Sequence, residues 1–245
     1  MISIIIPTYN NADKIGSCFD SILHQKYIPR PTEILIEKDP HDLAEVIVVN
    51  DGSTDDTNAV IDSFKPRFNE HGIDLTYVSQ DNQGAPAARN KGASLARGEY
   101  LLFCDADVVM EPVMLTRMLE ELESHPEASY AYSSFRWGRK IFRLWPFDED
   151  RLRAMPFIHT TSLIRREHFP GFDVSVKKLQ DWDLWLTMLE QGHGGIWIDQ
   201  VLFSVKTGGT MSEWVPSFVY KLLPFLPIVR KYRLAIDYVK RKHGL

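Results

Sequence analysis

The chain has 245 residues, a net charge of −5, and 44% hydrophobic and 25% charged residues, which fits one large α/β domain of a globular protein. The negative charge argues against general nucleic-acid binding. Only two cysteines are present, Cys18 and Cys104, so no disulfide framework is predicted and both read as buried thiols. No apolar run reaches the ~18 residues that span a bilayer, and Met1 leads into a strand pattern without an export signal. We therefore expect a cytoplasmic protein.

The first half of the chain alternates strand and helix patterns. Short runs of β-branched or apolar residues predict buried strands at 2–6, 46–49, 75–78 and 100–104. Helical spacing of apolar or small residues follows each of the first three, with Asn11 and Thr54 as predicted N-caps of the first two helices. Residues 27–45, which contain three prolines, are expected to form a surface excursion with one extra strand at 34–36. Alternating strands and helices predict a parallel, doubly wound sheet.

The second half is less regular. It contains one clear helical pattern at 180–189, and strand patterns at 128–135, 157–164, 196–198 and 201–206. No internal repeat or low-complexity linker divides the chain. We therefore predict a single α/β domain with a mixed, mainly parallel sheet flanked by helices.

Two carboxylates, Asp105 and Asp107, follow the buried run at 100–104. Positions i and i+2 of an extended chain point to the same side, and two acids at the end of a buried strand need a positive partner. Their hard oxygen ligands suit Mg²⁺ or Mn²⁺ bound together with a diphosphate. The alternative is that the pair caps a following helix opened by Pro112.

Other strand ends carry groups with a use beside a nucleotide. Tyr9 can stack on a base, Asp51 can accept from a base N–H or a ribose hydroxyl, and Arg89 can neutralise phosphate. Because the carboxyl ends of parallel strands meet at one edge of the sheet, we expect these groups to lie near Asp105 and Asp107.

The ordered set of motifs resembles the family 2 glycosyltransferases, which have the GT-A fold. The motifs are Ser3-Ile-Ile-Ile-Pro-Thr-Tyr-Asn10 and the segments at 48–57, 82–92, 105–107, 171–173 and 180–186. The resemblance covers roughly residues 2–212. It implies residues 1–110 as a nucleotide-binding half and 111–212 as an acceptor half, followed by a tail at 213–245.

The resemblance implies an inverting, metal-assisted enzyme that moves a sugar from a nucleoside-diphosphate sugar to a hydroxyl of a glycan or a lipid-linked glycan. Asp105 and Asp107 match the metal-binding DxD motif, and Asp181 matches the catalytic base. The nucleotide site would comprise Pro7, Thr8, Tyr9, Asp51, Arg89 and Asp105. For Asp183 we expect an exposed or hydrogen-bonding residue of the first helical turn.

Three departures from the family pattern are visible. Gln180 stands where many relatives have Glu before the base, and Thr207 replaces a His found in many relatives, so that Lys206 becomes a candidate for phosphate charge. The Gln-x-x-Arg-Trp signature of processive synthases is missing, which argues against a processive polymer exporter.

Two other functions remain open from sequence. A sugar-1-phosphate nucleotidyltransferase would want a Gly-rich basic loop after the first strand, where this chain has Pro-Thr-Tyr-Asn-Asn. A non-catalytic sugar-nucleotide or glycan-binding module would not need Asp105, Asp107 and Asp181. His159 is interpreted either as a strand histidine or as a residue that faces the acceptor.

The tail differs in composition from the rest of the chain. An apolar stretch from Trp214 to Val229, interrupted by three prolines, is followed by six basic residues and one acid, Asp237. Apolar anchors beside Lys and Arg are typical of a helix lying on anionic lipid. The alternative is that the tail packs on its own domain or on a partner subunit.

Overall fold

The computed structural model describes residues 1–26, 44–207 and 226–245, and the predicted strand at 34–36 and most of the apolar part of the tail lie outside them. The half that was predicted to bind the nucleotide consists of β1 (Ile2–Thr8), α1 (Ile15–Leu23), β2 (Ala44–Asn50), α2 (Thr57–Glu70), β3 (Asp74–Ser79), α3 (Ala85–Leu95) and β4 (Tyr100–Phe103). All residues of β1, β2 and β4 are buried. This burial on both faces explains why these strands are mostly apolar.

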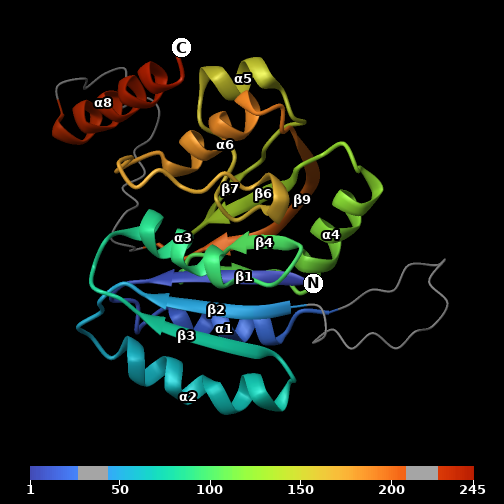
Figure 1. Cartoon of the computed structure of the whole chain (residues 1–245), viewed down its shortest axis with the longest axis vertical. Coiled ribbons are helices and arrows are strands. Elements are labelled where there is room, and N and C mark those ends of the chain that lie inside the picture. The colour runs from blue at the N-terminus through green and yellow to red at the C-terminus, as the bar shows by residue number, and fades with distance from the viewer. Residues whose placement is uncertain (27–43, 208–225) are drawn as a thin grey trace.

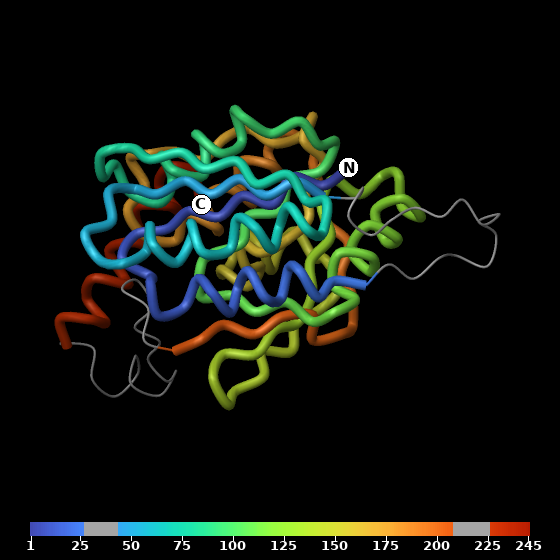
Figure 2. The backbone as a smooth tube through the Cα atoms, turned by 90° about the horizontal axis from the view of Figure 1, so that it is seen from below, coloured from blue at the N-terminus to red at the C-terminus, as the bar shows by residue number. Residues whose placement is uncertain are grey.

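The described strands form one mixed sheet in the order β3-β2-β1-β4-β8-β6-β9-β5, with β7 paired to β6. Strands β3, β2, β1 and β4 are all parallel. Helix α3 covers one face of this part, and α1 and α2 cover the other (Figures 1 and 2). The predicted doubly wound half is therefore confirmed.

The second half adds mostly antiparallel strands. It consists of β5 (Val108–Met110), α4 (Met114–Ser124), β6 (Tyr130–Trp137), β7 (Lys140–Phe142), α5 (Glu149–Ala154), β8 (Leu163–Arg165), α6 (Gln180–Glu190) and β9 (Gly195–Val205). Strand β8 joins the two halves because it pairs antiparallel with both β4 and β6.

Two strand predictions were wrong. The strands predicted at 196–198 and 201–206 are one strand, β9, whose register against β6 shifts around Ser134. The polar pair Asp199–Gln200 is exposed at this irregularity instead of ending the strand. The strand predicted at 157–164 is reduced to β8, because residues 157–162 adopt irregular backbone.

The two predicted helix N-caps were also wrong. Helix α1 begins at Ile15, after a turn in which the Asn11 carbonyl accepts hydrogen bonds from the backbone of Lys14 and Ile15, both at 3.0 Å. Helix α2 begins at Thr57, three residues after Thr54, and its first backbone N–H donates to the Asp55 carboxylate at 3.1 Å. In both cases a turn stands between the polar residue and the helix.

Helix α3 packs unusually close to the sheet at Gly92. A Cβ placed there would overlap Ile5 Cγ2 and lie 3.4 Å from Val49 Cγ2. The absence of a side chain lets α3 approach β1 and β2 and so fixes Arg89, one turn earlier, over the ends of these strands. The thiols of Cys18 and Cys104 lie in the core as predicted and form a hydrogen bond of 3.6 Å between their Sγ atoms, without a disulfide.

The C-terminal helix α8 (Pro227–Lys242) lies beside α6 (Figure 1). Val229 and Val239 are fully buried, and the last turn forms ion pairs with the domain. The described part of the tail therefore packs on its own domain, as one of the two alternatives predicted. None of the helices in residues 1–26, 44–207 and 226–245 is long and apolar enough to cross a membrane.

Candidate active site

The carboxyl ends of β2, β1 and β4 lie side by side. Thr8 pairs with Asn50 in the sheet register, and the Asp51 backbone N–H donates to the Thr8 carbonyl at 2.8 Å. On the other side of β1, the Cys104 N–H donates to the Ile5 carbonyl at 2.9 Å. The predicted convergence of strand ends is thus confirmed, since Asp51 and Asp105 flank the end of β1.

Asp51 is buried and organises the loop that leads into α3. Its Oδ1 accepts from Gln80 Nε2 at 2.8 Å and from the Gln83 backbone N–H at 2.9 Å, while Oδ2 accepts from the Gly84 N–H at 2.7 Å. Gly84 has φ +91°, a conformation that favours glycine. The carboxylate therefore positions residues 80–84; its predicted contact with a nucleotide stays a prediction.

Arg89 lies at the centre of a group of polar side chains from three elements, which we call the Arg89 cluster. Its side chain is 5% exposed, and Nη2 lies 2.7 Å from Asp105 Oδ1 while Nη1 donates to Gln180 Oε1 at 3.0 Å. The guanidinium also lies 5.3 Å from the ring centre of Phe172. Arg89 therefore connects α3, the end of β4 and the start of α6. Its Nε has no hydrogen-bond partner in the part of the chain that the structure describes.

The two predicted metal ligands are half-buried. Desolvation, followed by the neighbouring charge of Asp105, raises the pKa of Asp107 to about 6. The backbone N–H of Lys206 donates to the Asp107 carbonyl at 2.9 Å, so β9 supports this turn. Asp105 is paired with Arg89, and both carboxylates offer the hard oxygen ligands that suit Mg²⁺ or Mn²⁺.

The described residues contain no group of three or more His, Cys, Asp and Glu side chains placed to hold a metal ion. Mg²⁺ is commonly held by one or two carboxylates together with water and substrate phosphates. The pair of Asp105 and Asp107 therefore fits an ion that arrives with a diphosphate, and does not fit a cage made of protein ligands alone.

Asp181 is the second residue of α6. Its Oδ1 accepts from the backbone N–H of Trp182 at 2.9 Å, and burial raises the pKa of its carboxyl above the ordinary value. The preceding Leu179 has φ +59°, which turns the chain sharply into the helix. Trp182 and Trp185 are fully buried beneath it, and the predicted core packing of Trp185 is confirmed. Buried aromatic side chains thus support a carboxylate that is more basic than an exposed aspartate.

The remaining predicted nucleotide residues lie at the end of β1. Pro7 and Thr8 are buried in the strand, and the Thr8 Oγ1 has no hydrogen-bond partner among the described residues. Tyr9 is 39% exposed, so its ring is accessible for stacking. Thr8 and Arg89 therefore both offer buried polar atoms on the side where the ligand is predicted.

Burial is the main cause that lowers the pKa of His159 to about 4, and the nearby charges of Asp105 and Arg89 have smaller, opposite effects on it. Its Nδ1 accepts from the backbone N–H of Thr161 at 3.0 Å, and its ring packs against both Phe135 and Phe203, which stack on each other. His159 is therefore a neutral histidine in the wall of the site, and its use toward an acceptor stays a prediction.

Some residues of the site were not found from sequence. Asn90 forms two hydrogen bonds with the Phe172 backbone, of 2.7 and 2.8 Å, and so fixes the Gly171-Phe-Asp173 turn against α3. Asp183, expected to be exposed or hydrogen-bonding, is 3% exposed and bonded to the last turn of α8. Neither contact has a local sequence signal, because the partners are 59 or more positions apart.

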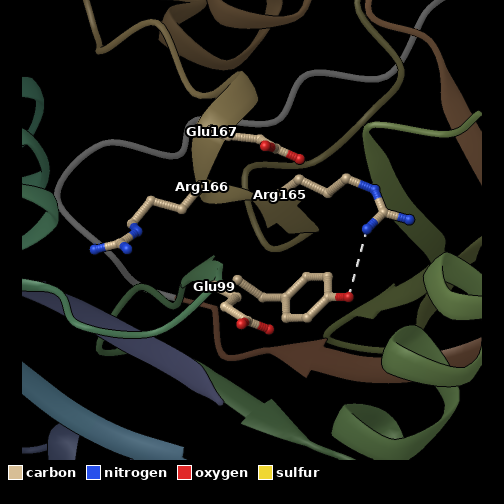
Figure 3. Close-up of a pocket in the computed structure, with 5 residues that line it drawn as sticks. Glu99, Arg165, Arg166 and Glu167 are labelled. Atoms are coloured by element: carbon tan, nitrogen blue, oxygen red, sulfur yellow. Dashed lines mark hydrogen bonds between the residues drawn. The ribbon is translucent and has the colours of Figure 1, made fainter. Parts of the chain in front are cut away.

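A surface cavity of about 500 Å³ lies elsewhere, lined by Glu99, Tyr100, Arg165, Arg166 and Glu167 (Figure 3). Glu99 precedes β4, whereas Asp105 follows it, so the cavity is at the opposite end of this strand. The Arg165 guanidinium donates hydrogen bonds to the backbone carbonyls of Ala128, at 2.9 Å, and Leu122, at 2.6 Å. This cavity is therefore separate from the predicted site.

The sequence matches the model of glycosyl transferase family 2 over residues 3–176. The chain belongs to this family and is a glycosyltransferase by that membership.

Two curated relatives illustrate the range of the family. A chondroitin synthase of Pasteurella multocida is 30% identical over 205 residues, which cover 78% of this chain and 19% of that protein. The chain thus spans about a fifth of that relative's length. The putative teichuronic acid biosynthesis glycosyltransferase TuaG of Bacillus subtilis is 26% identical over 259 residues, which cover 98% of this chain and 95% of the relative.

Solved structures show the same fold. S. aureus TarS in complex with UDP superposes with a TM-score of 0.68 at 19% identity, covering 84% of this chain and 60% of that one. The mannosyltransferase PcManGT of Pyrobaculum calidifontis, in complex with GDP-Man and Mn²⁺, gives 0.65 at 24% identity, covering 88% and 57%. The predicted GT-A fold is confirmed.

Proposed function

We propose that the protein transfers a sugar from a nucleoside-diphosphate sugar to a hydroxyl acceptor, with inversion at the anomeric carbon. The observation that carries the proposal is the Arg89 cluster, in which one buried guanidinium bonds Asp105 at the end of β4 and Gln180 beside Asp181. This arrangement brings the predicted donor-binding carboxylates and the predicted base to one edge of the sheet.

On the donor side, Pro7, Thr8, Tyr9 and Asp51 would line the base and ribose. Asp105 and Asp107 would hold a divalent cation, which neutralises charge on the leaving diphosphate when bound. Arg89 retains a buried N–H without a partner among the described residues, and this donor suits a phosphate oxygen. The solved structures with UDP, or with GDP-Man and Mn²⁺, support a nucleotide donor and a metal.

On the acceptor side, Asp181 would accept the proton of the attacking hydroxyl. Single displacement needs one base positioned opposite the leaving group. The raised pKa makes the Asp181 carboxylate a stronger base than an exposed aspartate, and the Trp182 N–H restrains its orientation. Gln180 bonds Arg89 without adding a second negative charge beside the base.

We also propose that the acceptor side operates near an anionic lipid surface. The exposed residues of α8 include four basic side chains and one large apolar one: Arg230, Lys231, Arg233, Arg241 and Leu234. A helix whose one side packs on the domain and whose other side is basic and apolar suits the headgroup region of a membrane. A lipid-linked glycan is the acceptor class that this placement favours.

The test is a panel of nucleoside-diphosphate sugars, each incubated with the full chain, with and without Mn²⁺. Binding is followed by thermal shift, since a bound donor stabilises by mass action, and turnover by release of the nucleoside diphosphate. We expect one donor to be turned over in a metal-dependent manner, with an inverted anomeric centre in the product by NMR. Binding without any turnover would support a non-catalytic module, and a retained configuration would reject single displacement.

A further inference from the structure

Helix α8 contacts the catalytic helix α6 through a buried carboxylate. Asp183, with a side chain 4% exposed, lies 2.7 Å from Lys242 Nζ. The ring of His243, only 3% exposed, lies with Nε2 3.0 Å from Asp183 Oδ1 and Nδ1 2.7 Å from Glu190 Oε1. Two consecutive residues at the end of α8 thus bond two carboxylates on α6.

Lys242 also reaches the loop that precedes α6. Its Nζ lies 2.7 Å from Asp173 Oδ2, and this hydrogen bond lowers the pKa of Asp173 to about 2. Asp173 follows Phe172, whose backbone is held by Asn90 on α3. One ammonium group therefore ties the loop and the helix together on the side away from Arg89.

The geometry of α6 separates its two acidic residues. Two positions along an α-helix correspond to a rotation of about 200°, so Asp183 and Asp181 point to nearly opposite sides. Asp183 faces α8, and Asp181 belongs to the side near Arg89, whose charge acts on it. The helix is thus held by Gln180 and Arg89 at its start and by Lys242 and His243 from behind.

We propose that Lys242 and His243 are positioning residues that hold α6 so that Asp181 faces the acceptor hydroxyl. The inference rests on the proposed role of Asp181 as base. The donor-binding residues lie on β1, β2, α3 and β4, which Lys242 does not contact. Loss of Lys242 therefore weakens transfer while donor binding stays intact, because general-base catalysis is sensitive to small displacements.

The test compares Lys242→Met, Lys242→Arg and His243→Gln in the full chain, with Lys240→Met as the matched control. Lys240 is on the same turn of α8 and makes no ion pair among the described residues. We expect Lys242→Met to lower kcat by about 10–100-fold with the donor KM within about twofold, His243→Gln to follow in the same direction, and Lys242→Arg to recover most of the activity. Lys240→Met should match the wild type.

Active-site titration with the nucleotide corrects every rate for the folded fraction. An unchanged kcat in Lys242→Met overturns the proposal. A parallel loss of kcat and donor affinity that Lys242→Arg does not restore also overturns it, because such a pattern indicates general destabilisation. Asp181→Asn is measured alongside: if that variant retains transfer, the proposed base itself is wrong, whereas its inactivity beside a fully active Lys242→Met refutes only the positioning role.

Discussion

Replacement of Asp51 by Asn tests how the nucleotide-binding loop is held. The carboxylate accepts three hydrogen bonds, two of them from the backbone of Gln83 and Gly84. An Asn side chain keeps one oxygen but turns an NH₂ group toward N–H donors. The change removes about one charge-assisted bond and leaves a partly buried N–H unpaired, which together cost roughly 2–4 kcal/mol of unfolding free energy.

The expected loss of unfolding free energy can be measured by thermal unfolding. For a chain of this size, 1 kcal/mol shifts Tm by roughly 2–4 °C, so a loss of about 3 kcal/mol lowers Tm by roughly 6–12 °C. Chemical denaturation with urea gives the free energy directly. Asp81→Asn is the matched control, because Asp81 is exposed and forms no hydrogen bond among the described residues.

The same variant separates stability from ligand binding. Because residues 80–84 lead into α3, we expect Asp51→Asn to weaken nucleotide binding also at temperatures where the protein is fully folded. A Tm within about 2 °C of the wild type, or an equal shift in Asp81→Asn, would refute the reasoning that three donors on a buried carboxylate fix this loop.

Four further predictions follow from the site and its support. Asp181→Asn, which preserves shape and the hydrogen bond from Trp182, should reduce transfer by about 10²–10⁴-fold, or about 2.7–5.4 kcal/mol of barrier, with donor affinity unchanged by calorimetry; transfer within a few-fold of wild type would assign the base elsewhere. Asp107→Ala should abolish the Mn²⁺-dependent part of nucleotide binding in a folded protein, and full turnover in excess EDTA would contradict a metal role. Gly92→Ala should destabilise the fold by about 1–3 kcal/mol in urea unfolding, since the added methyl overlaps Ile5; an unchanged midpoint would show that α3 shifts freely. Lys231→Glu combined with Arg230→Glu should weaken co-sedimentation with anionic vesicles, and this binding should itself decline with salt; identical partitioning of variant and wild type would leave α8 only its packing role.

The parts of the fold that were predicted correctly depend on short stretches of sequence. The runs at 2–6 and 100–104 are mostly apolar because both faces of a central parallel strand are buried, and that local fact suffices to place Asp105 at the carboxyl edge of the sheet. The chain order of strand and helix then brings Asp51 and Arg89 to the same edge without any knowledge of side-chain contacts.

The errors and omissions have different physical causes. Helix α2 is not capped by Thr54, because the side chain of Asp55, one residue later, accepts the hydrogen bond from the first backbone N–H of the helix. The interruption predicted at Asp199 is instead an exposed irregularity inside β9. The contacts of Asp183 with Lys242 depend on where a distant helix docks, and no periodicity in either segment records that docking. Sequence therefore predicts burial more reliably than it predicts long-range polar partners.

The position of β1 at the centre of the parallel half has a consequence for biosynthesis. Ile2 pairs with both Ala44 and Tyr100, so a mostly apolar strand must wait for a neighbour made about a hundred residues later. At a synthesis rate of 5–20 residues per second, one edge of β1 stays unpaired for roughly 5–20 s. Exposed β-branched segments of this kind are aggregation-prone, so the interval before β4 emerges is the stage of synthesis at which we expect residues 2–6 to be most exposed to wrong pairing.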